Sequence, residues 1–493
     1  MLRTIFSIGL LQAGGIVISA LRSKLFAVLL GPAGFGIVAT IDQLVTSLAQ
    51  LSNFSVPFTA LKFLSRSHSA GEQEFKRSYA AFLRLMLGLA VVATVASVAV
   101  VLWALERIDP QLAQHRATVV IAMLGMPALL LMMFFVNAIA ARQESMRSVL
   151  LTVLYNAVIL IFGGIGCWLG GIRGIYLGAV PATTLLIGLT WLMLRARFKL
   201  PRHERTTAIW AELRTHRQMG QTAFYTYVAV ASIAGTMLLA RYVSITQLSA
   251  EAAGLFQACL GIALSIGAVL GPANTLYLSP FVNRAIPAAE KTEAVGRFLP
   301  RLILLFCMGA VPVLLFPELV LRVLFSERFI GAASVVVWFV AWQFVSQIAT
   351  AYHHLLIGLD DMRGFCTALV AGNVVAVVGC VTWTGEFGLH GLGAAFVAGA
   401  IVSLSLTLFR LRRRHAASVP TGTIPLLVFA PLALVALTMI PIGAEFAAVG
   451  ICRRLALAVG FGGALWLLLP KELRCELANG IRARLARGRK TSD

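Results

Sequence analysis

Long apolar runs separated by short polar connections make up most of the chain. A run of about 18 or more apolar residues with few charges predicts a helix that crosses a membrane. The pattern predicts about fourteen such helices, at residues 4–29, 35–61, 79–104, 117–141, 148–169, 172–194, 219–242, 252–282, 298–320, 331–358, 364–385, 388–409, 422–441 and 450–470. They fall into groups of six, six and two. The expected fold class is therefore an all-α integral membrane protein.

An internal repeat relates the two groups of six helices. The segment Gly171-Ile172-Arg173-Gly174-Ile175 recurs 217 positions later as Gly388-Leu389-His390-Gly391-Leu392, and Met146-Arg147 recurs 216 positions later as Met362-Arg363. Residues 30–36 have a looser echo at 248–254, 218 positions later. Many transporters are built from repeated halves around a central site that can face either side of the membrane. We therefore expect an N-lobe and a C-lobe around a central cavity.

The repeat and the loops together predict five regions. Residues 1–197 form the N-lobe six-helix bundle, 198–218 a basic cytoplasmic linker, and 219–415 the C-lobe six-helix bundle. An additional transmembrane helix pair spans 416–470, and a basic amphipathic cytoplasmic tail spans 471–493. The additional pair has no counterpart in the repeat. The sequence leaves open whether it packs outside the bundle or forms a groove that faces lipid.

The distribution of basic residues predicts the orientation in the membrane. The net charge is +21, and about 30 of the 41 Lys and Arg residues fall in connections on one side, against about 8 on the other. Loops rich in Lys and Arg stay in the cytoplasm, so both termini are expected there. The basic surplus is then expected to meet anionic membrane lipids rather than nucleic acid. The seven cysteines show no paired spacing, so we predict neither a disulfide framework, nor a metal site, nor a cofactor.

Several cations lie in or beside the predicted spans, where an unpaired charge is costly and often functional. Arg22 and Lys24 lie late in the first helix, and Arg241 has nearly the same place in the second repeat. We predict that these three contact a diphosphate in the cavity at the outer side. Lys62 and Arg284 end two helices on the cytoplasmic side and are the matching candidates there. For each of them, anchoring to lipid headgroups is the alternative interpretation.

Asp42 is the clearest acidic residue within a predicted span. It is a candidate gate that pairs with Arg22 or Lys24, or a candidate site for coupling to protons or cations, or a polar group satisfied within the bundle. The acidic pair at 360–361 is expected to pair with Arg363. We predict no catalytic residue.

Glycine and proline residues are candidate hinges in three helices. Gly14 and Gly15 lie in the first helix, Pro57 in the second, and Gly271 and Pro272 in the eighth. Proline removes a backbone hydrogen bond and can kink a helix. Bent helices beside a cavity suit movement between inward-open and outward-open states, although ordinary helix packing also uses glycine.

Three segments resemble one family of exporters. Residues 24–36, followed by Asp42-Gln43-Leu44, are similar to the first-loop signature of Wzx-type lipid-linked oligosaccharide flippases. This family is the polysaccharide-transport branch of the MATE-like (MOP) exporter superfamily. Residues 277–280 and 324–329 are similar to it too, and the resemblance covers about residues 1–415. Flippases for O-antigen and enterobacterial common antigen usually have twelve helices, so residues 420–470 depart from the pattern. A count of fourteen resembles the lipid II flippases.

The resemblance implies a function in the bacterial inner membrane. The substrate would be an undecaprenyl-diphosphate-linked glycan made on the cytoplasmic face for a cell-surface polysaccharide. Its sugars and diphosphate cannot cross hydrocarbon without losing their hydrogen-bond partners in water. A cationic cavity would carry this headgroup to the periplasmic leaflet by alternating access, while the polyprenyl tail stays in lipid. The resemblance also implies polysaccharide polymerase and chain-length machinery as partners.

Three other functions compete with this interpretation. A MATE-type drug or cation antiporter predicts a mostly acidic site, whereas the charges within these spans are mostly basic. A lipid II flippase is the second alternative. A membrane polysaccharide polymerase, ligase or glycosyltransferase would need a large outer loop or domain that carries catalytic residues. The short outer connections leave little room for one.

Overall fold

A computed structural model describes residues 2–108, 110–142, 144–198, 217–272, 274, 278–282, 286–415 and parts of 425–478, without some of the side chains in these ranges. Every regular element of these residues is a helix. Within them, eight segments are long and apolar enough to cross a membrane. The predicted class, an all-α multi-pass membrane protein, is confirmed. The arrangement of fourteen helices in two lobes stays a prediction, and most of the predicted helix 422–441 lies outside the described residues.

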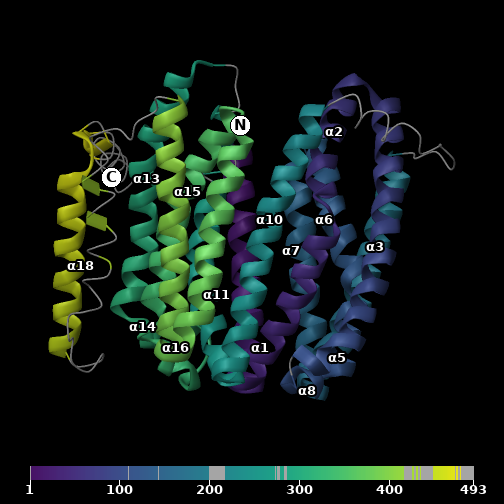
Figure 1. Cartoon of the computed structure of the whole chain (residues 1–493), viewed down its shortest axis with the longest axis horizontal. Coiled ribbons are helices and arrows are strands. Elements are labelled where there is room, and N and C mark those ends of the chain that lie inside the picture. Colours follow the sequence, from purple (N-terminus) through teal and green to yellow (C-terminus); the bar gives the residue numbers. More distant parts are fainter. Residues whose placement is uncertain are drawn as a thin grey trace, which may run out of the picture. The chain divides into compact units, whose positions relative to one another are not determined.

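Three of the long segments are pairs of helices joined at a glycine. α1 (Leu2–Ser52) turns at Gly31, α8 (Gly164–Phe198) at Gly170 and Gly171, and α16 (Met362–His415) at Gly388. The two limbs of α1 diverge from its turn (Figure 1). Gly31, Gly171 and Gly388 have φ angles of 68°, 57° and 59°, a region that side chains with a Cβ rarely enter. The glycines thus place the turns where the apolar runs predicted breaks.

The remaining elements continue the helical chain between these pairs. In chain order they are α2 (Val56–Ala70), α3 (Glu72–Ile108), α4 (Pro110–Ala113), α5 (Arg116–Met123), α6 (Met126–Ala141), α7 (Ser145–Val158), η1 (Ile159–Gly163), α10 (Arg217–Val243), η2 (Ser244–Leu248), α11 (Ala250–Pro272), α12 (Ser279–Val282), α13 (Ala288–Leu315), α14 (Pro317–Leu324), η4 (Glu327–Ala332), α15 (Val336–Gly358) and α18 (Ala448–Leu468).

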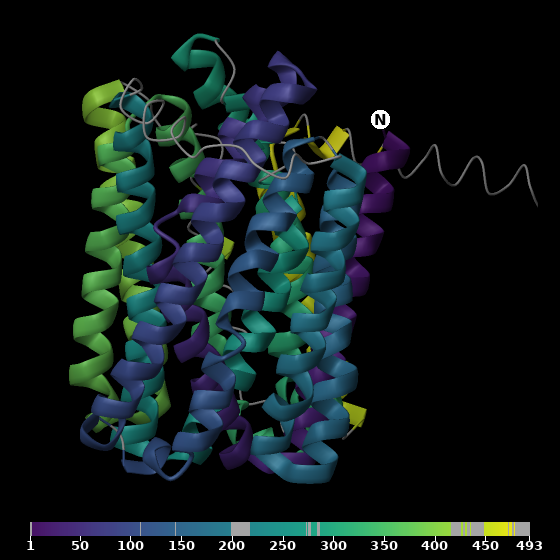
Figure 2. The same ribbon diagram turned by 90° about the vertical axis from the view of Figure 1, so that its right-hand side faces the viewer.

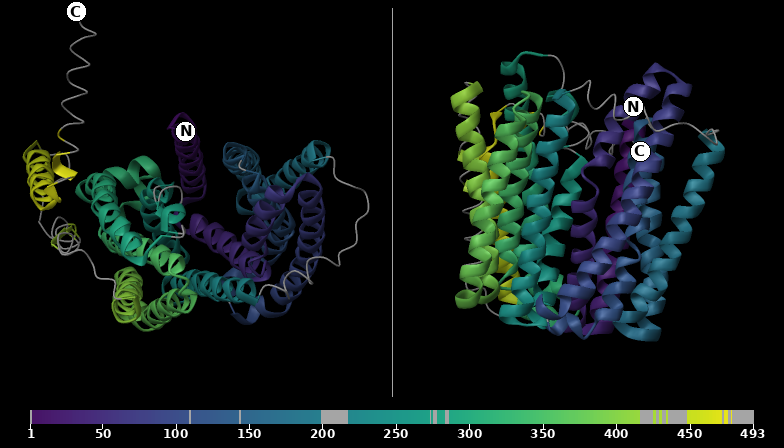
Figure 3. Two further views of the ribbon diagram at one scale, coloured as in Figure 1. Left: turned by 90° about the horizontal axis from the view of Figure 1, so that it is seen from above. Right: turned by 45° about the vertical axis from the view of Figure 1, so that its right-hand side comes forward.

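The chain divides into two compact units that differ from the predicted lobes. Unit 1 contains Met1–Cys259, Leu321–Ala332 and Leu369–Gly399; unit 2 contains Leu260–Val320, Ala333–Ala368 and Ala400–Asp493. In unit 1, α1 packs against α7, α8 and α10, and α3 packs against α2 and α6. Figure 2 shows the long helices of this unit running alongside one another, and the left view of Figure 3 shows them end on. The five predicted regions stay predictions, and most of the linker lies outside the described residues.

Aromatic side chains fill the core of unit 1 where α3, α6 and α8 meet. Phe75 and Tyr79 of α3 pack against Phe198 of α8, and Tyr79 also contacts Phe134 of α6. The guanidinium of Arg142 lies over the Phe198 ring, 4.6 Å from its centroid. Lipid tails are as apolar as these side chains, so close packing rather than escape from water holds such helices together.

An ion pair closes the open end of the last helical hairpin in each repeat. Glu144, just before α7, pairs with Arg197 near the end of α8 at 3.0 Å. Asp361, just before α16, pairs with Arg414 near its end at 3.5 Å. Both residues of the second pair lie 217 positions after their counterparts, the same offset as the glycine turns. The repeat therefore preserves both ends of this hairpin.

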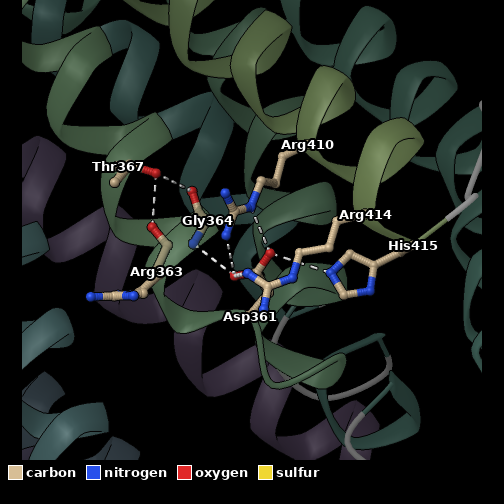
Figure 4. A network of polar contacts seen from close by, with 7 residues as sticks. All are labelled: Asp361, Arg363, Gly364, Thr367, Arg410, Arg414 and His415. Atoms are coloured by element: carbon tan, nitrogen blue, oxygen red, sulfur yellow. Dashed lines mark hydrogen bonds and ion pairs between the residues drawn. The ribbon is translucent and has the colours of Figure 1, made fainter.

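Asp361 makes more contacts than Glu144. Its carboxylate accepts hydrogen bonds from Arg410 Nε at 2.8 Å and from the backbone N–H of Gly364 at 3.0 Å, and it lies 3.3 Å from His415 Nε2 (Figure 4). For Asp361 the expected pairing with Arg363 is wrong, because its partners are Arg410, Arg414 and His415 and the Arg363 guanidinium points away from its carboxylate in Figure 4. Burial by itself raises the pKa of Asp361, but the contacts with Arg410, Gly364 and His415 outweigh it. They hold the pKa well below its usual 3.8.

The candidate hinge residues lie in different backbone settings. α1 runs through Gly14 and Gly15 with helical backbone angles. Pro57 lies in the first turn of α2, where a missing N–H costs nothing, directly after a break at residues 53–55. Gly271 and Pro272 are the last residues of α11. Their role in movement stays a prediction.

Candidate functional site

A cavity of about 270 Å³ lies within unit 1. Both limbs of α1 line it, together with α7, η1, α8, α6 and the end of α5. Its polar lining includes Arg22, Asp42, Tyr155, Asn156 and Tyr176, and apolar side chains make up most of the rest. A polar cavity inside a bundle of membrane helices is the usual form of a transporter site.

The turn at Gly31 brings Arg22 and Asp42 to the same depth. Arg22 lies nine residues before this turn and Asp42 eleven after it, which places them roughly 13 and 16 Å from the turn at 1.5 Å per residue. Each side chain lines the cavity from its own limb of α1. The two are close enough for the guanidinium and the carboxylate to interact electrostatically. The first hairpin alone therefore supplies both a cation and an anion.

Tyr176 fixes the position of the Asp42 carboxylate. The Tyr176 hydroxyl lies 2.9 Å from Asp42 Oδ1, to which it donates, and 3.2 Å from the Val38 carbonyl oxygen one turn earlier on α1. Tyr176 is buried, whereas Asp42 is exposed to the space of the cavity. A hydroxyl that donates to a carboxylate is a charge-assisted bond, stronger than a neutral one. The carboxylate is thus oriented by α8 and remains open to a ligand.

Arg241 adds a second cation from α10. Only 2% of this residue is exposed, and its guanidinium lies over the Phe256 ring, 4.6 Å from the centroid. Arg241 is close enough to Asp42 for their charges to interact. In the part of the chain that the structure describes, its Nε and Nη1 have no hydrogen-bond partner. Arg22 and Asp42 line the cavity and the buried Arg241 lies behind its lining, so the three groups carry a formal charge of +1 if all are ionised.

Of the other three predicted cations, the structure describes the side chain of Lys24 alone. Lys24 is exposed and does not line the cavity, whereas Arg22 does. Residues two positions apart in a helix point roughly 200° apart around its axis, so these two side chains face nearly opposite ways. The Lys62 side chain and all of Arg284 lie outside the described residues. Of the five cations predicted to bind substrate, Arg22 lines the cavity with Asp42, and Arg241 is close enough for its charge to act on Asp42.

Sequence reasoning missed Tyr155, Asn156 and Tyr176. They carry no formal charge, so a search for charges within the spans passed over them. For Asn156 the repeat held a signal, since Asn373 lies 217 positions later. In the second repeat this asparagine donates a hydrogen bond of 2.8 Å to Ser232 Oγ. A comparison of polar residues at this offset would have found Asn156.

The arrangement suits binding of a polar, partly anionic group. The Arg22 guanidinium can contact phosphate oxygens and the buried Arg241 adds positive charge, while the tyrosines and Asn156 can exchange hydrogen bonds with hydroxyls. The Asp42 carboxylate can take up a proton or a cation. Among the described residues, no group of three or more His, Cys, Asp or Glu side chains is placed to hold a metal ion.

Comparisons of the sequence give one family and distant relatives. The family described as "Polysaccharide biosynthesis protein" matches residues 1–286. The lipid III flippase of Escherichia coli (strain K12) is 22% identical over 414 residues, which cover 80% of this chain and 95% of that protein. A protein of the same name from Shigella flexneri matches equally well.

Comparisons of the structure show a shared fold. The inward closed conformation of the lipid II flippase MurJ matches with a TM-score of 0.67 at 12% identity, covering 94% of this chain and 99% of that one. An inward-facing multidrug resistance MATE family transporter of the MOP superfamily matches with a TM-score of 0.62 at 13% identity, covering 86% and 96%. Identities this low show the fold alone.

Proposed function

Because the chain belongs to the polysaccharide biosynthesis protein family, we propose that it is a flippase for a lipid-linked oligosaccharide. The substrate is a glycan joined through diphosphate to undecaprenol, and it moves from the cytoplasmic to the periplasmic leaflet of the bacterial inner membrane. The unit then serves the synthesis of O-antigen, common antigen or an exopolysaccharide. No bond is made or broken. The chain is not an enzyme, in agreement with the names of its relatives, which are flippases and transporters.

The observation that carries the proposal is a cavity within a membrane bundle that Arg22 and Asp42 line, with Arg241 buried close enough for its charge to act on Asp42. A charged side chain buried in a membrane is costly, so such a residue is retained where it serves a function. Two arginines suit a diphosphate, because a planar guanidinium can donate two parallel hydrogen bonds to phosphate oxygens. Hydroxyl and amide groups around them suit sugars. The polyprenyl tail does not need the cavity, since it is already soluble in lipid.

Alternating access supplies the movement. The cavity opens to one leaflet, accepts the headgroup, and then opens to the other while the tail slides through lipid. Both termini lie in the cytoplasm, as the distribution of Lys and Arg favours. Anionic lipids surround the basic connections, and polymerase and chain-length proteins take up the product. Twelve helices form the transport core, and the helices after residue 415 are an addition to it.

A second candidate function rests on Asp42. A carboxylate that faces a cavity and accepts a hydrogen bond from a tyrosine can bind a cation or a proton, as a drug or cation antiporter requires. The fold shared with a multidrug transporter gives this candidate its weight. A lipid II flippase would use the same cations for a different headgroup.

Transfer of defined lipids in proteoliposomes separates these functions. The purified protein is reconstituted with a fluorescent undecaprenyl-diphosphate oligosaccharide, with lipid II, or with a cationic dye and an imposed pH gradient. The proposal expects the oligosaccharide to reach the opposite leaflet faster than in protein-free vesicles, and the dye not to accumulate. Transfer of lipid II alone would assign the second flippase function. Accumulation of the dye without lipid transfer would replace the proposal with the antiporter.

A further inference from the structure

Two repeat-related helices touch through glycine close to the Gly31 turn. Gly36 lies on the second limb of α1, and Gly254 lies near the start of α11. A Cβ built at Gly36 would collide with the Ala250 carbonyl oxygen, and one built at Gly254 would collide with the Pro32 carbonyl oxygen. No side chain larger than hydrogen fits at either position with this backbone. We call the Gly36–Gly254 contact the glycine latch.

Aromatic packing supports the α1 side of the glycine latch. Phe35, next to Gly36, is buried, and its ring centroid lies 5.8 Å from those of both Phe325 and Phe329. Edge-to-face contacts of this kind give packing energy beyond the buried area. Gly36 is thus held on the side of α1, and the latch can open only if α11 moves away from α1 or if this packing is rearranged.

Arg241 interacts both with the α11 side of the glycine latch and with the Asp42 carboxylate at the cavity. Phe256, whose ring faces the Arg241 guanidinium, lies two residues after Gly254 on α11. Asp42, whose charge also acts on Arg241, lies six residues after Gly36 on α1. The guanidinium is therefore attracted in two directions, toward a ring on one latch helix and toward a carboxylate on the other.

Arg241 makes fewer hydrogen bonds than we would expect of an arginine with a purely structural role. A buried cation usually has its donors satisfied, because each unpaired donor costs about 1–3 kcal/mol. Here Nε and Nη1 are buried and without a partner among the described residues, while the ring satisfies only the face of the guanidinium. Such a group gains free energy when an anion comes within reach, and it moves to gain it.

We propose that Arg241 couples the negative charge in the cavity to the glycine latch. An anionic headgroup in the cavity attracts the guanidinium more strongly than Asp42 does and draws it away from Phe256. α11 then loses its cation–π contact at Phe256, and Gly254 separates from Gly36. With Asp42 neutral and the cavity empty, the ring is the stronger attraction, and the latch closes more tightly.

The first test measures whether the latch closes one route to the cavity. Thr46, which lines the cavity, is changed to cysteine in a background where the two exposed cysteines are removed (Cys452→Ser, Cys475→Ser). A neutral maleimide that does not cross membranes is applied to each side of proteoliposomes in turn. Gly36→Ala and Gly254→Ala should each raise the labelling rate from one side ~5-fold or more. Gly88→Ala, with open space around its Cβ, is the control and should change nothing. Equal rates in all four proteins would overturn the latch.

The second test measures the coupling through Arg241. With Phe256 present, Asp42→Asn should slow labelling of the cysteine, and inorganic pyrophosphate should speed it, each by ~5-fold or more. In Phe256→Leu both effects should disappear, and in Phe256→Tyr, which keeps the ring, both should remain. Comparison across the two backgrounds cancels any direct effect of Asp42 on the nearby thiol. Each variant must elute from size exclusion and melt as the parent does.

Either of two results would overturn the coupling. Effects of equal size in Phe256→Leu and in the parent would show that Arg241 does not act through this ring. Pyrophosphate without effect in the parent would show that anions do not draw the guanidinium away. Neither test uses a lipid-linked glycan, so failure here is separate from failure of the proposed flippase function.

Discussion

Tyr176 Oη lies 2.9 Å from Asp42 Oδ1 and joins α8 to the second limb of α1 at the cavity. This bond holds the acidic group of the site in one orientation while leaving it open to a ligand. Through it, the final hairpin of the first repeat controls the geometry of the first hairpin. The cavity is therefore a product of tertiary packing within unit 1, and several of its consequences can be measured.

Removal of the Tyr176 hydroxyl should impair transport without unfolding the protein. Tyr176→Phe keeps the ring in place and deletes the bond to the carboxylate. A hydrogen bond to a charged group contributes about 1.5–3 kcal/mol, so the initial rate of glycan transfer should fall roughly tenfold or more. The measurement is initial transfer in proteoliposomes.

A matched control for this change is Tyr79→Phe. Tyr79 is also buried, but its hydroxyl has no partner in the described part of the chain. Its removal should leave the transfer rate unchanged and the melting temperature the same or slightly higher. An equal loss of transfer in both variants would contradict a specific role for Tyr176.

Alanine at the turn of α8 should test the backbone directly. Gly170 and Gly171 both have open space where a Cβ would be, but Gly171 has a φ of 57° and Gly170 a φ of −145°. Gly171→Ala should destabilise the protein by about 1–3 kcal/mol through backbone strain, and Gly170→Ala should be close to neutral. Thermal unfolding in detergent measures both. Equal melting temperatures for the two variants would show that the turn rearranges at no cost.

The Asp361 cluster should contribute to stability. The Asp361 side chain is 3% exposed and accepts two hydrogen bonds from Arg410. Asp361→Asn leaves Arg410 without its carboxylate and should lower the free energy of unfolding by about 1–3 kcal/mol. Asp360→Asn is the control, because this neighbour is exposed and its φ of 57° suits asparagine. A smaller loss in the Asp361 variant than in the Asp360 variant would contradict the cluster.

The same cluster predicts how stability depends on pH. The pKa of Asp361 is lower in the folded protein than its ordinary 3.8, so the unfolded chain binds the proton more readily. The stabilisation is complete at pH values above about 4 and is lost as the pH falls through the folded pKa. Acidification from pH 6 to pH 3 should therefore lower the melting temperature of the parent more than that of Asp361→Asn. Parallel curves for the two proteins would contradict this account.

The sequence predicted the course of the chain better than the faces of its helices. The apolar runs and the repeat located the turns at Gly171 and Gly388, because both depend on local composition. The choice between Arg22 and Lys24 depended on the rotation of α1 about its axis, which no pattern within the helix determines. Tyr176 was missed because its importance comes from a partner 134 residues away. Contacts of this kind exist only after the helices pack.

The central claim is that cations at the cavity, rather than basic residues in general, carry the anionic headgroup. Arg22 and Lys24 provide the sharpest comparison, since they lie two residues apart on one helix and only Arg22 lines the cavity. The decisive measurement is transfer of a fluorescent undecaprenyl-diphosphate oligosaccharide by Arg22→Gln and Lys24→Gln in proteoliposomes. The account predicts a loss of tenfold or more, at least about 1.4 kcal/mol, in the first and less than about twofold in the second. Equal rates in the two variants, or a greater loss at Lys24, would contradict it.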